Sequence, residues 1–190
     1  MELTLRDAAT VVHGMGFGAL LLFGFSGAFI GIHATSVSRS PWLPGDREWR
    51  LFSLYLGVMA GLAWLAVFAG AYVIYPWYRA VPPAGAALAG YPQRLLMSNP
   101  ATSGWHDIGM EWKEHIAWLA PISLTACAYV FWRYGARLYA MKGLRNVVIG
   151  LALLAFVATG VAGFFGAMLN KFAPVRGGAA IVLMKGKAGG

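Results

Sequence analysis

The stretch VVIGLALLAFVATGVAGFFGAML, residues 147–169, contains no charged side chain. The hydrocarbon core of a bilayer is about 30 Å thick, and a helix needs about 20 apolar residues to cross it. Lipid offers no water to backbone N–H and C=O groups, so a crossing segment must satisfy them within a helix or a closed barrel. Because this stretch is one continuous apolar run and not an alternating pattern, it predicts a membrane-spanning helix.

Three further stretches have the same character, since residues 8–32, 51–75 and 116–132 also carry no charge. Over the 190 residues, 59% are hydrophobic and 12% are charged, whereas about a quarter of the residues of a soluble domain are charged. The sequence therefore predicts an all-α fold, an integral membrane four-helix bundle surrounded by the lipid bilayer. Its spans are expected at about 8–32, 51–75, 114–134 and 147–169. This class excludes a soluble enzyme and, despite the net charge of +8, a nucleic-acid partner.

The segments outside the spans suggest how the single membrane domain is organised. Residues 76–113 include five prolines and are expected to form an ordered lid outside the membrane, between the second and third spans. Residues 171–190 contain several Gly and Lys and are expected to be a flexible tail. We expect the membrane to be a bacterial cytoplasmic (inner) membrane. With four spans, both termini lie on the same side of it. The short basic links between spans favour termini outside the cell, while the basic tail favours the opposite orientation.

Small residues recur at a spacing of four along the apolar stretches, for example at Gly27 and Gly31 and at Gly57 and Gly61. In lipid, helices associate where small residues let their backbones approach closely. These rows are therefore predicted to mark helix–helix faces, or places where a flat ligand lies against the backbone.

Histidine is the one titratable residue that lies clearly inside a span, at His13. His13 is about one turn inside the first span, and His115 opens the third. Because these two spans run in the same direction, the two imidazoles are expected at similar depth near one face of the membrane. Two imidazoles at matched depth on neighbouring helices can hold a b-type haem non-covalently.

The surroundings of His13 allow two interpretations. A flat porphyrin needs positions without side chains beside its axial ligand and cations for its propionates. The residues that would meet these needs are Gly14, Gly16, Gly18, Arg79 and Arg94. Alternatively, His13 bonds a backbone carbonyl at the interface, His115 belongs to a polar helix start, and no cofactor is bound. The single cysteine, Cys127, excludes a C-x-x-C-H haem attachment and a self-contained iron–sulfur cluster.

The segment WHDIGMEWKEH, residues 105–115, is the second candidate for chemistry. A helical spacing of four puts Asp107, Glu111 and His115 on one face. Such a stripe is typical of a proton path or of a carboxylate that orients a ligating imidazole, and with His106 it forms a candidate metal site. The same acids are equally expected at an ordinary helix start, where the helix dipole favours them. The segment YPWYR, residues 75–79, has the aromatic and basic composition of a membrane–water interface.

With histidines near one face of a short antiparallel bundle, the chain resembles the small membrane cytochrome b subunits of respiratory oxidoreductases. Through VHGMGFG, residues 12–18, it is also similar, to a smaller degree, to the four-helix membrane domains of the copper-resistance D type. The first resemblance implies a haem b bound axially by His13 and His115, and electron exchange with quinone or a partner cytochrome.

We therefore expect a membrane subunit of a bacterial electron-transfer complex that contacts other membrane subunits. In this role the chain is an electron-transfer or non-catalytic subunit and not a whole enzyme. Two alternatives stay open. One is a cofactor-free structural or assembly subunit of a membrane redox complex, and the other is a small metal or solute transporter.

Overall fold

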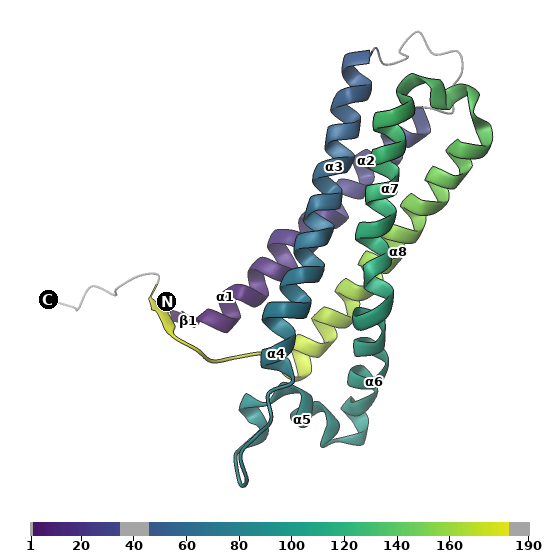
Figure 1. The fold of residues 1–190 in the computed structure, drawn as a ribbon. Helices are drawn as coiled ribbons and strands as arrows, with labels where there is room; N and C mark the ends of the chain where they lie inside the picture. The colour runs from purple at the N-terminus through teal and green to yellow at the C-terminus, as the bar shows by residue number, and fades with distance from the viewer. Residues whose placement is uncertain (1, 35–45, 183–190) are drawn as a thin grey trace, which may run out of the picture.

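The computed structural model describes residues 2–34 and 46–182, and this part of the chain is helical apart from loops and one short pair of strands (Figure 1). Four of its helices are long and apolar enough to cross a membrane, and they comprise Leu5–Ala34, Arg47–Tyr78, Pro100–Tyr134 and Lys142–Phe172. The expectations of an all-helical fold and of four apolar helices at these places are confirmed.

Three of the four long helices change their winding along their length, and only α8 (Lys142–Phe172) is a single α-helix. The first is built from α1 (Leu5–Val11), a π-helical segment η1 (Val12–Ala19) and α2 (Leu20–Ala34). The second is built from α3 (Asp46–Phe68), a π-helical segment η2 (Ala69–Ile74) and α4 (Tyr75–Tyr78). The third is built from α6 (Pro100–His115), a 3-10 turn η4 (Ile116–Trp118) and α7 (Leu119–Tyr134).

Prolines and polar caps explain where several of these pieces begin. Pro100 occupies the first turn of α6, where the missing N–H is not needed. The side chain of Asn99 caps the same end by accepting from the Ala101 N–H at 2.9 Å. Pro121 lies in the first turn of α7, directly after the tight turn η4. The third span therefore starts well before its apolar stretch, inside the segment that we expected to be a lid.

The main core lies between α2, α3, α7 and α8, and aromatic rings fill it. The ring of Phe131 on α7 stacks on Trp49 at 5.9 Å and meets Phe52 edge-on at 4.8 Å between centroids. Gly27 and Gly31 of α2 lie directly against the rings of Tyr55 and Phe52 on α3. This row of small residues is therefore a helix–helix face, as the spacing predicted.

The other predicted row in the second span behaves differently. A Cβ built on Gly57 or on Gly61 would meet nothing within 4 Å, so these two glycines do not form a packing face within the described chain.

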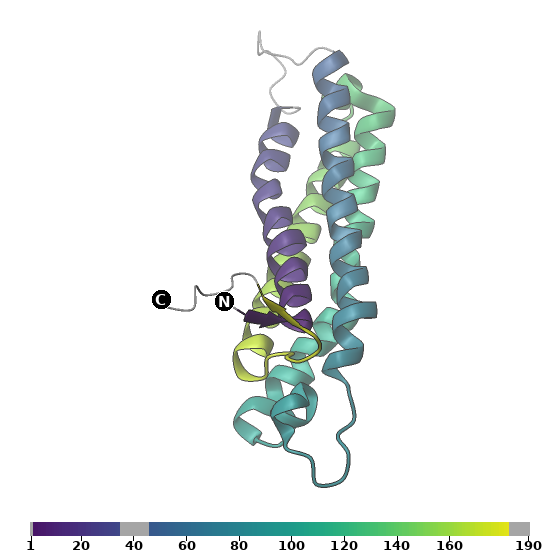
Figure 2. The same ribbon diagram turned by 90° about the vertical axis from the view of Figure 1, so that its left-hand side faces the viewer.

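A second, smaller core closes the end of the bundle where the first and last described residues and α5 (Pro92–Met97) lie (Figures 1 and 2). Its buried members come from α4, α5, α6, α8 and the segment after α8, and they are Tyr78, Leu96, Met110, Leu169, Ala173 and Val175. Two short turns of 3-10 helix complete the described links, η3 (Leu88–Gly90) beside α5 and η5 (Gly135–Ala140) between α7 and α8.

The two ends of the described chain are joined. Strand β1 (Glu2–Thr4) pairs antiparallel with β2 (Ala180–Val182). The guanidinium of Arg6 lies 5.4 Å over the ring of Trp77, which ties this ribbon to the second long helix. We expected a flexible tail from residue 171, but α8 continues through Phe172 and the strand follows it. Residues 183–190 of that expected tail lie outside the described residues.

The outward faces of the long helices carry large apolar side chains. Phe23 is 79% exposed, Ile30 73% and Trp132 71%. A soluble protein would not leave many such side chains in water, so this surface suits a surrounding of lipid.

Candidate functional site

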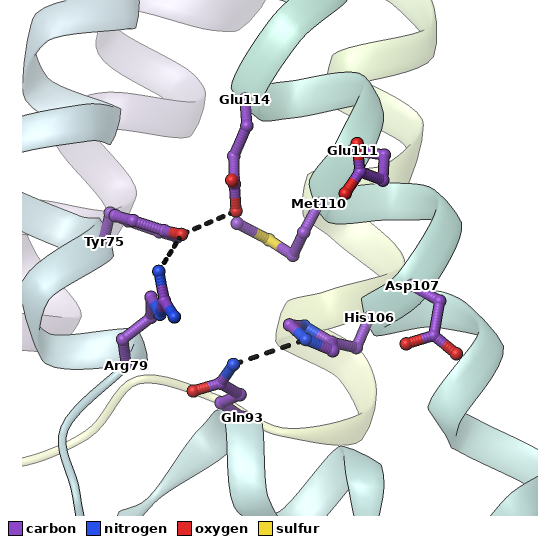
Figure 3. Close-up of a pocket in the computed structure, with 8 residues that line it drawn as sticks. All are labelled: Tyr75, Arg79, Gln93, His106, Asp107, Met110, Glu111 and Glu114. Carbon is purple, nitrogen blue, oxygen red and sulfur yellow. Dashed lines mark hydrogen bonds between the residues drawn. The ribbon is translucent and has the colours of Figure 1, made fainter.

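A polar cluster (Figure 3) lies at the end of the bundle that also holds α5 and the paired strands β1 and β2 (Figure 1). It forms where YPWYR, residues 75–79 at the end of the second long helix, faces the first half of the third long helix. Hydrogen bonds join the two at Tyr75 with Glu114 and at Tyr78 with His106. The two segments whose composition stood out in the sequence therefore meet in space.

Tyr75 is at the centre of the first set of contacts. Its hydroxyl donates to Oε1 of Glu114 at 2.7 Å and accepts from Nη1 of Arg79 at 2.9 Å (Figure 3). The guanidinium of Arg79 also lies 5.4 Å over the Tyr75 ring. The phenol thus lies between a cation and a carboxylate, and a charge-assisted hydrogen bond of this kind is stronger than one between neutral groups.

Tyr78, His106 and Gln93 form the second set. The residue Tyr78 is 5% exposed. Its hydroxyl lies 2.7 Å from Nδ1 of His106. The other ring nitrogen of His106 lies 3.3 Å from the side-chain amide of Gln93 on α5 (Figure 3). Both nitrogens of His106 are therefore engaged, and α5 contributes directly to the site.

These side chains, apart from that of Tyr78, line a cavity of about 330 Å³. Its walls are Tyr75, Arg79, Gln93, His106, Asp107, Met110, Glu111 and Glu114. The cavity offers three carboxylates, one imidazole, one guanidinium and one amide, so it can bind a small group with hydrogen-bond acceptors and donors and exchange protons with it.

The α6 residues that bond to the second long helix are offset from the stripe that the sequence predicted, although Asp107 and Glu111 of that stripe also line the cavity. His106, Met110 and Glu114, which follow one another at a spacing of four, face the second long helix, as the bonds of His106 and Glu114 show. The predicted stripe is offset from them by one residue, which is about 100° around a helix. Its members Glu111 and His115 have side chains that are 75% and 66% exposed.

The predicted stripe does contain one of the expected contacts. Nδ1 of His115 lies 3.3 Å from Oε2 of Glu111 and 3.2 Å from the Glu111 carbonyl oxygen. Glu111 thus orients the His115 ring, and Asp107 lies one turn before it. The role of this contact stays a prediction, and so does a proton path through Asp107 and Glu111, both of which touch the cavity.

His13 lies where the two π-helical segments of the bundle meet. Its half-buried ring lies against η2, since a Cβ built on Gly70 would be 3.0 Å from the His13 Cε1. Its Nδ1 is buried without a hydrogen-bond partner. Single π-turns inside α-helices are frequent at functional sites, and a buried nitrogen without a partner is expected to find one in the working protein.

His13 and His115 do not meet in this arrangement. Within the described chain no hydrogen bond or ring contact joins them, because the His13 ring points at Gly70 while the His115 ring points away from the bundle. As arranged, the pair does not fit the two faces of one haem. The haem between them stays a prediction.

The other residues expected around a haem are dispersed. Among the glycines, Gly14 is exposed with nothing within 4 Å of a built Cβ, while Gly16 and Gly18 meet only atoms of η1 itself. Arg79 is bonded to Tyr75, and Arg94 is exposed on α5.

The expected metal site at His106 is not supported by the geometry. Among residues 2–34 and 46–182, no group of three or more His, Cys, Asp and Glu side chains is placed to hold a metal ion. The contacts of His106 with Tyr78 and Gln93 occupy both ring nitrogens, so no metal is proposed there.

Five residues of this end of the bundle were missed by sequence reasoning, namely Tyr75, Tyr78, Gln93, Lys113 and Glu114. Lys113 joins α6 to α8, since its Nζ donates to the Ala162 carbonyl at 3.5 Å. The neighbouring Trp112 also joins the two helices, since its indole N–H donates to the Ala158 carbonyl at 3.3 Å. The unusual composition of residues 75–79 and 105–115 was the sequence feature that pointed to this region. Composition does not show which side chains of the two segments face each other.

No family model, no curated protein and no solved structure matches the chain.

Proposed function

We propose that the chain is an integral membrane subunit of a bacterial electron-transfer complex, and that the cavity at the end of its bundle binds the head group of a quinone. Membrane residence is supported by four apolar helices of sufficient length and by the large apolar side chains on their outward faces. The short basic links at the opposite end of the bundle favour an orientation with the cavity and both termini away from the cytoplasm.

One observation carries the quinone assignment: two phenols, one on the cavity wall and one buried, are each bonded to a cavity-lining group that can take up a proton. These are Tyr75 with Glu114 and Tyr78 with His106, each at 2.7 Å. Oxidation of a quinol releases two electrons and two protons, so its site needs hydrogen-bond partners for two oxygens and acceptors for two protons. Glu114 and His106 line the cavity, and the 2.7 Å distances join each of them to its phenol, so quinol protons would reach these two bases through the phenols.

The size and place of the cavity agree with this ligand. Ligand pockets usually start at about 300 Å³, and a cavity of about 330 Å³ takes a single ring with its substituents. The residues before Tyr75 and after His115 belong to the apolar helices. A quinone head group would therefore lie in the polar cavity while its apolar tail stays beside the bundle.

The experiment is a binding titration of the purified protein in lipid nanodiscs with a short-chain ubiquinone and a short-chain menaquinone, followed by quenching of tryptophan fluorescence. The same titration is made with the quinol forms, whose hydroxyl can donate to a carboxylate. Glu114→Gln removes that carboxylate, and Tyr75→Phe removes the phenol that holds it in place. Loss of a hydrogen bond to a charged group costs about 1.5–3 kcal/mol, so the Kd for the quinol should rise about tenfold or more.

Matched controls lie elsewhere on the same chain. Tyr72→Phe changes a phenol that is 72% exposed one turn before Tyr75, and Glu48→Gln changes an exposed carboxylate at the other end of the bundle. Both should bind quinone as the unaltered protein does. Absence of binding by the unaltered protein, or the same Kd for the quinol in Glu114→Gln, contradicts the proposal.

A second candidate function, a structural or assembly subunit, is favoured by the outward stripe on α6. The side chains of Glu111 and His115 are largely exposed, and exposed ionisable side chains beside an apolar helix suit contact with another membrane subunit. Under this alternative, Glu111→Lys should release the chain from its native complex in blue-native gels, and the isolated chain should not bind quinone.

A further inference from the structure

Two tyrosines at the end of the bundle are arranged as a pair, and each is bonded to its own proton acceptor. The rings of Tyr75 and Tyr78 stack with centroids 6.4 Å apart and planes at 18°. Tyr78 lies 2.7 Å from His106 Nδ1, and Tyr75 lies 2.7 Å from Glu114 Oε1. Tyr78 is buried and Tyr75 lines the cavity, so the pair leads from the protein interior to the cavity wall.

Satisfaction of the hydrogen bonds assigns the proton between Tyr78 and His106 to the phenol. If Nδ1 carried the proton and donated it, the hydroxyl proton of the buried Tyr78 would have no acceptor among the hydrogen bonds of the described residues. If the phenol donates to Nδ1, the ring proton lies on Nε2, where the Gln93 amide accepts it once its oxygen is turned to that side. Because buried polar groups are nearly always satisfied, the second arrangement is preferred.

A phenol so placed can lose an electron much more easily than an isolated one. Removing an electron alone leaves a strongly acidic phenol cation radical, which is unfavourable in an apolar interior. When the proton leaves together with the electron, the phenol becomes a neutral phenoxyl radical, and the positive charge moves to the base. For Tyr78 that base is His106, at the wall of a cavity that also holds the carboxylates of Asp107, Glu111 and Glu114, and these stabilise an imidazolium.

We propose that Tyr78 is a redox-active tyrosine that gives one electron to a strong one-electron oxidant, such as a high-valent metal centre or an oxygen-derived radical. In this step the Tyr78 O–H bond breaks, an N–H bond forms at Nδ1 of His106, and the electron passes to the oxidant. The products are a neutral phenoxyl radical, an imidazolium and the reduced oxidant.

The stacked pair provides a second step. Tyr75 passes an electron to the Tyr78 radical, which takes its proton back from His106, while the proton of Tyr75 moves to Oε1 of Glu114. The radical is then at Tyr75, on the cavity wall, where a quinol can reduce it. Only this last reduction by quinol rests on the proposed function, since oxidation of Tyr78 needs no quinone.

The experiment uses the 190-residue protein in nanodiscs without quinone. A flash generates tris(bipyridine)ruthenium(III), with persulfate as the sacrificial acceptor, and the phenoxyl radical is followed by transient absorption and by electron paramagnetic resonance. The unaltered protein should form a tyrosyl radical whose rate of formation falls in D2O. In His106→Gln the base is lost, and a general base usually contributes about 100-fold or more, so radical formation should slow by about that factor.

Tyr78→Phe should remove the fast phase of radical formation and keep the ring that packs in the smaller core. Tyr72→Phe, which changes an exposed phenol on the same long helix, should leave the fast phase intact. An equal rate in His106→Gln, or an unchanged fast phase in Tyr78→Phe, overturns the proposal. The isotope effect in the unaltered protein is independent of any variant, and its absence also overturns the proposal. Quinone binding can fail while this radical forms, so the two proposals are tested separately.

Discussion

Replacing Gly31 with Ala tests whether close backbone approach holds the first two spans together. A Cβ built on Gly31 would overlap Cε2 and Cζ of the Phe52 ring and would lie 2.7 Å from Cδ2. That ring cannot simply turn aside, because Phe131 packs edge-on against it at 4.8 Å and Tyr55 stacks on it at 6.1 Å between centroids. Overpacking of this kind costs about 1–3 kcal/mol, while Ala in place of a helical Gly returns up to about 1 kcal/mol.

Compared with Gly→Ala at a helical position with free space, Gly31→Ala should therefore cost about 1–3 kcal/mol, which for a chain of this size is a difference in Tm of roughly 2–12 °C. The measurement is thermal unfolding of the detergent-solubilised protein, followed by far-UV circular dichroism. Gly61→Ala is the matched control, since a Cβ there meets nothing within 4 Å, and its Tm should stay the same or rise slightly. Equal Tm values for the two variants would refute the reasoning, because the contact with Phe52 would then carry no energy.

Two further predictions concern the haem expected between His13 and His115 and the contact of Arg6 with Trp77. If the predicted haem b is bound, the purified protein should show a b-type band in its reduced-minus-oxidised spectrum, and His13→Ala and His115→Ala should each abolish it; a spectrum without that band contradicts the haem. Arg6→Gln removes the cation over Trp77, an interaction worth about 0.5–1 kcal/mol at an exposed site. Amide hydrogen exchange in the strand Ala180–Val182 should then become several times faster, and unaltered exchange would show that Arg6 does not hold the ribbon.

The spans could be predicted from the sequence because lipid imposes a length and an apolar composition on any crossing segment. The faces of the helices could not be predicted in the same way. Around residues 105–115 the polar side chains His106, Asp107, Glu111, Glu114 and His115 surround the helix, so two stripes of spacing four were available, one residue apart. Only the partner on the second helix, Tyr75 or Tyr78, decides which stripe points inward.

The depth argument for the histidines met the same difficulty. Counting residues along two parallel spans gives the height of His13 and His115 but not the direction of either ring. His13 turns toward Gly70, where the absence of a side chain makes room, whereas His115 turns outward to Glu111 of its own helix. The rise per residue is the same along every α-helix, so depth can be counted from the sequence. The direction in which a side chain points also depends on how its helix is rotated against its neighbours, and the sequence does not state which helices are neighbours.

The geometry of the site depends on the part of the chain outside the apolar stretches. Tyr78 can face His106 only because its ring is packed among Leu96 of α5, Leu169 of α8 and Val175 of the segment that leads to β2. Helix packing in lipid comes from close contact and not from exclusion of water, so the four spans alone would leave the end of the bundle free to splay. Burial of this smaller core against water supplies the missing driving force. The lid and the terminal ribbon therefore hold the two tyrosines against their proton acceptors.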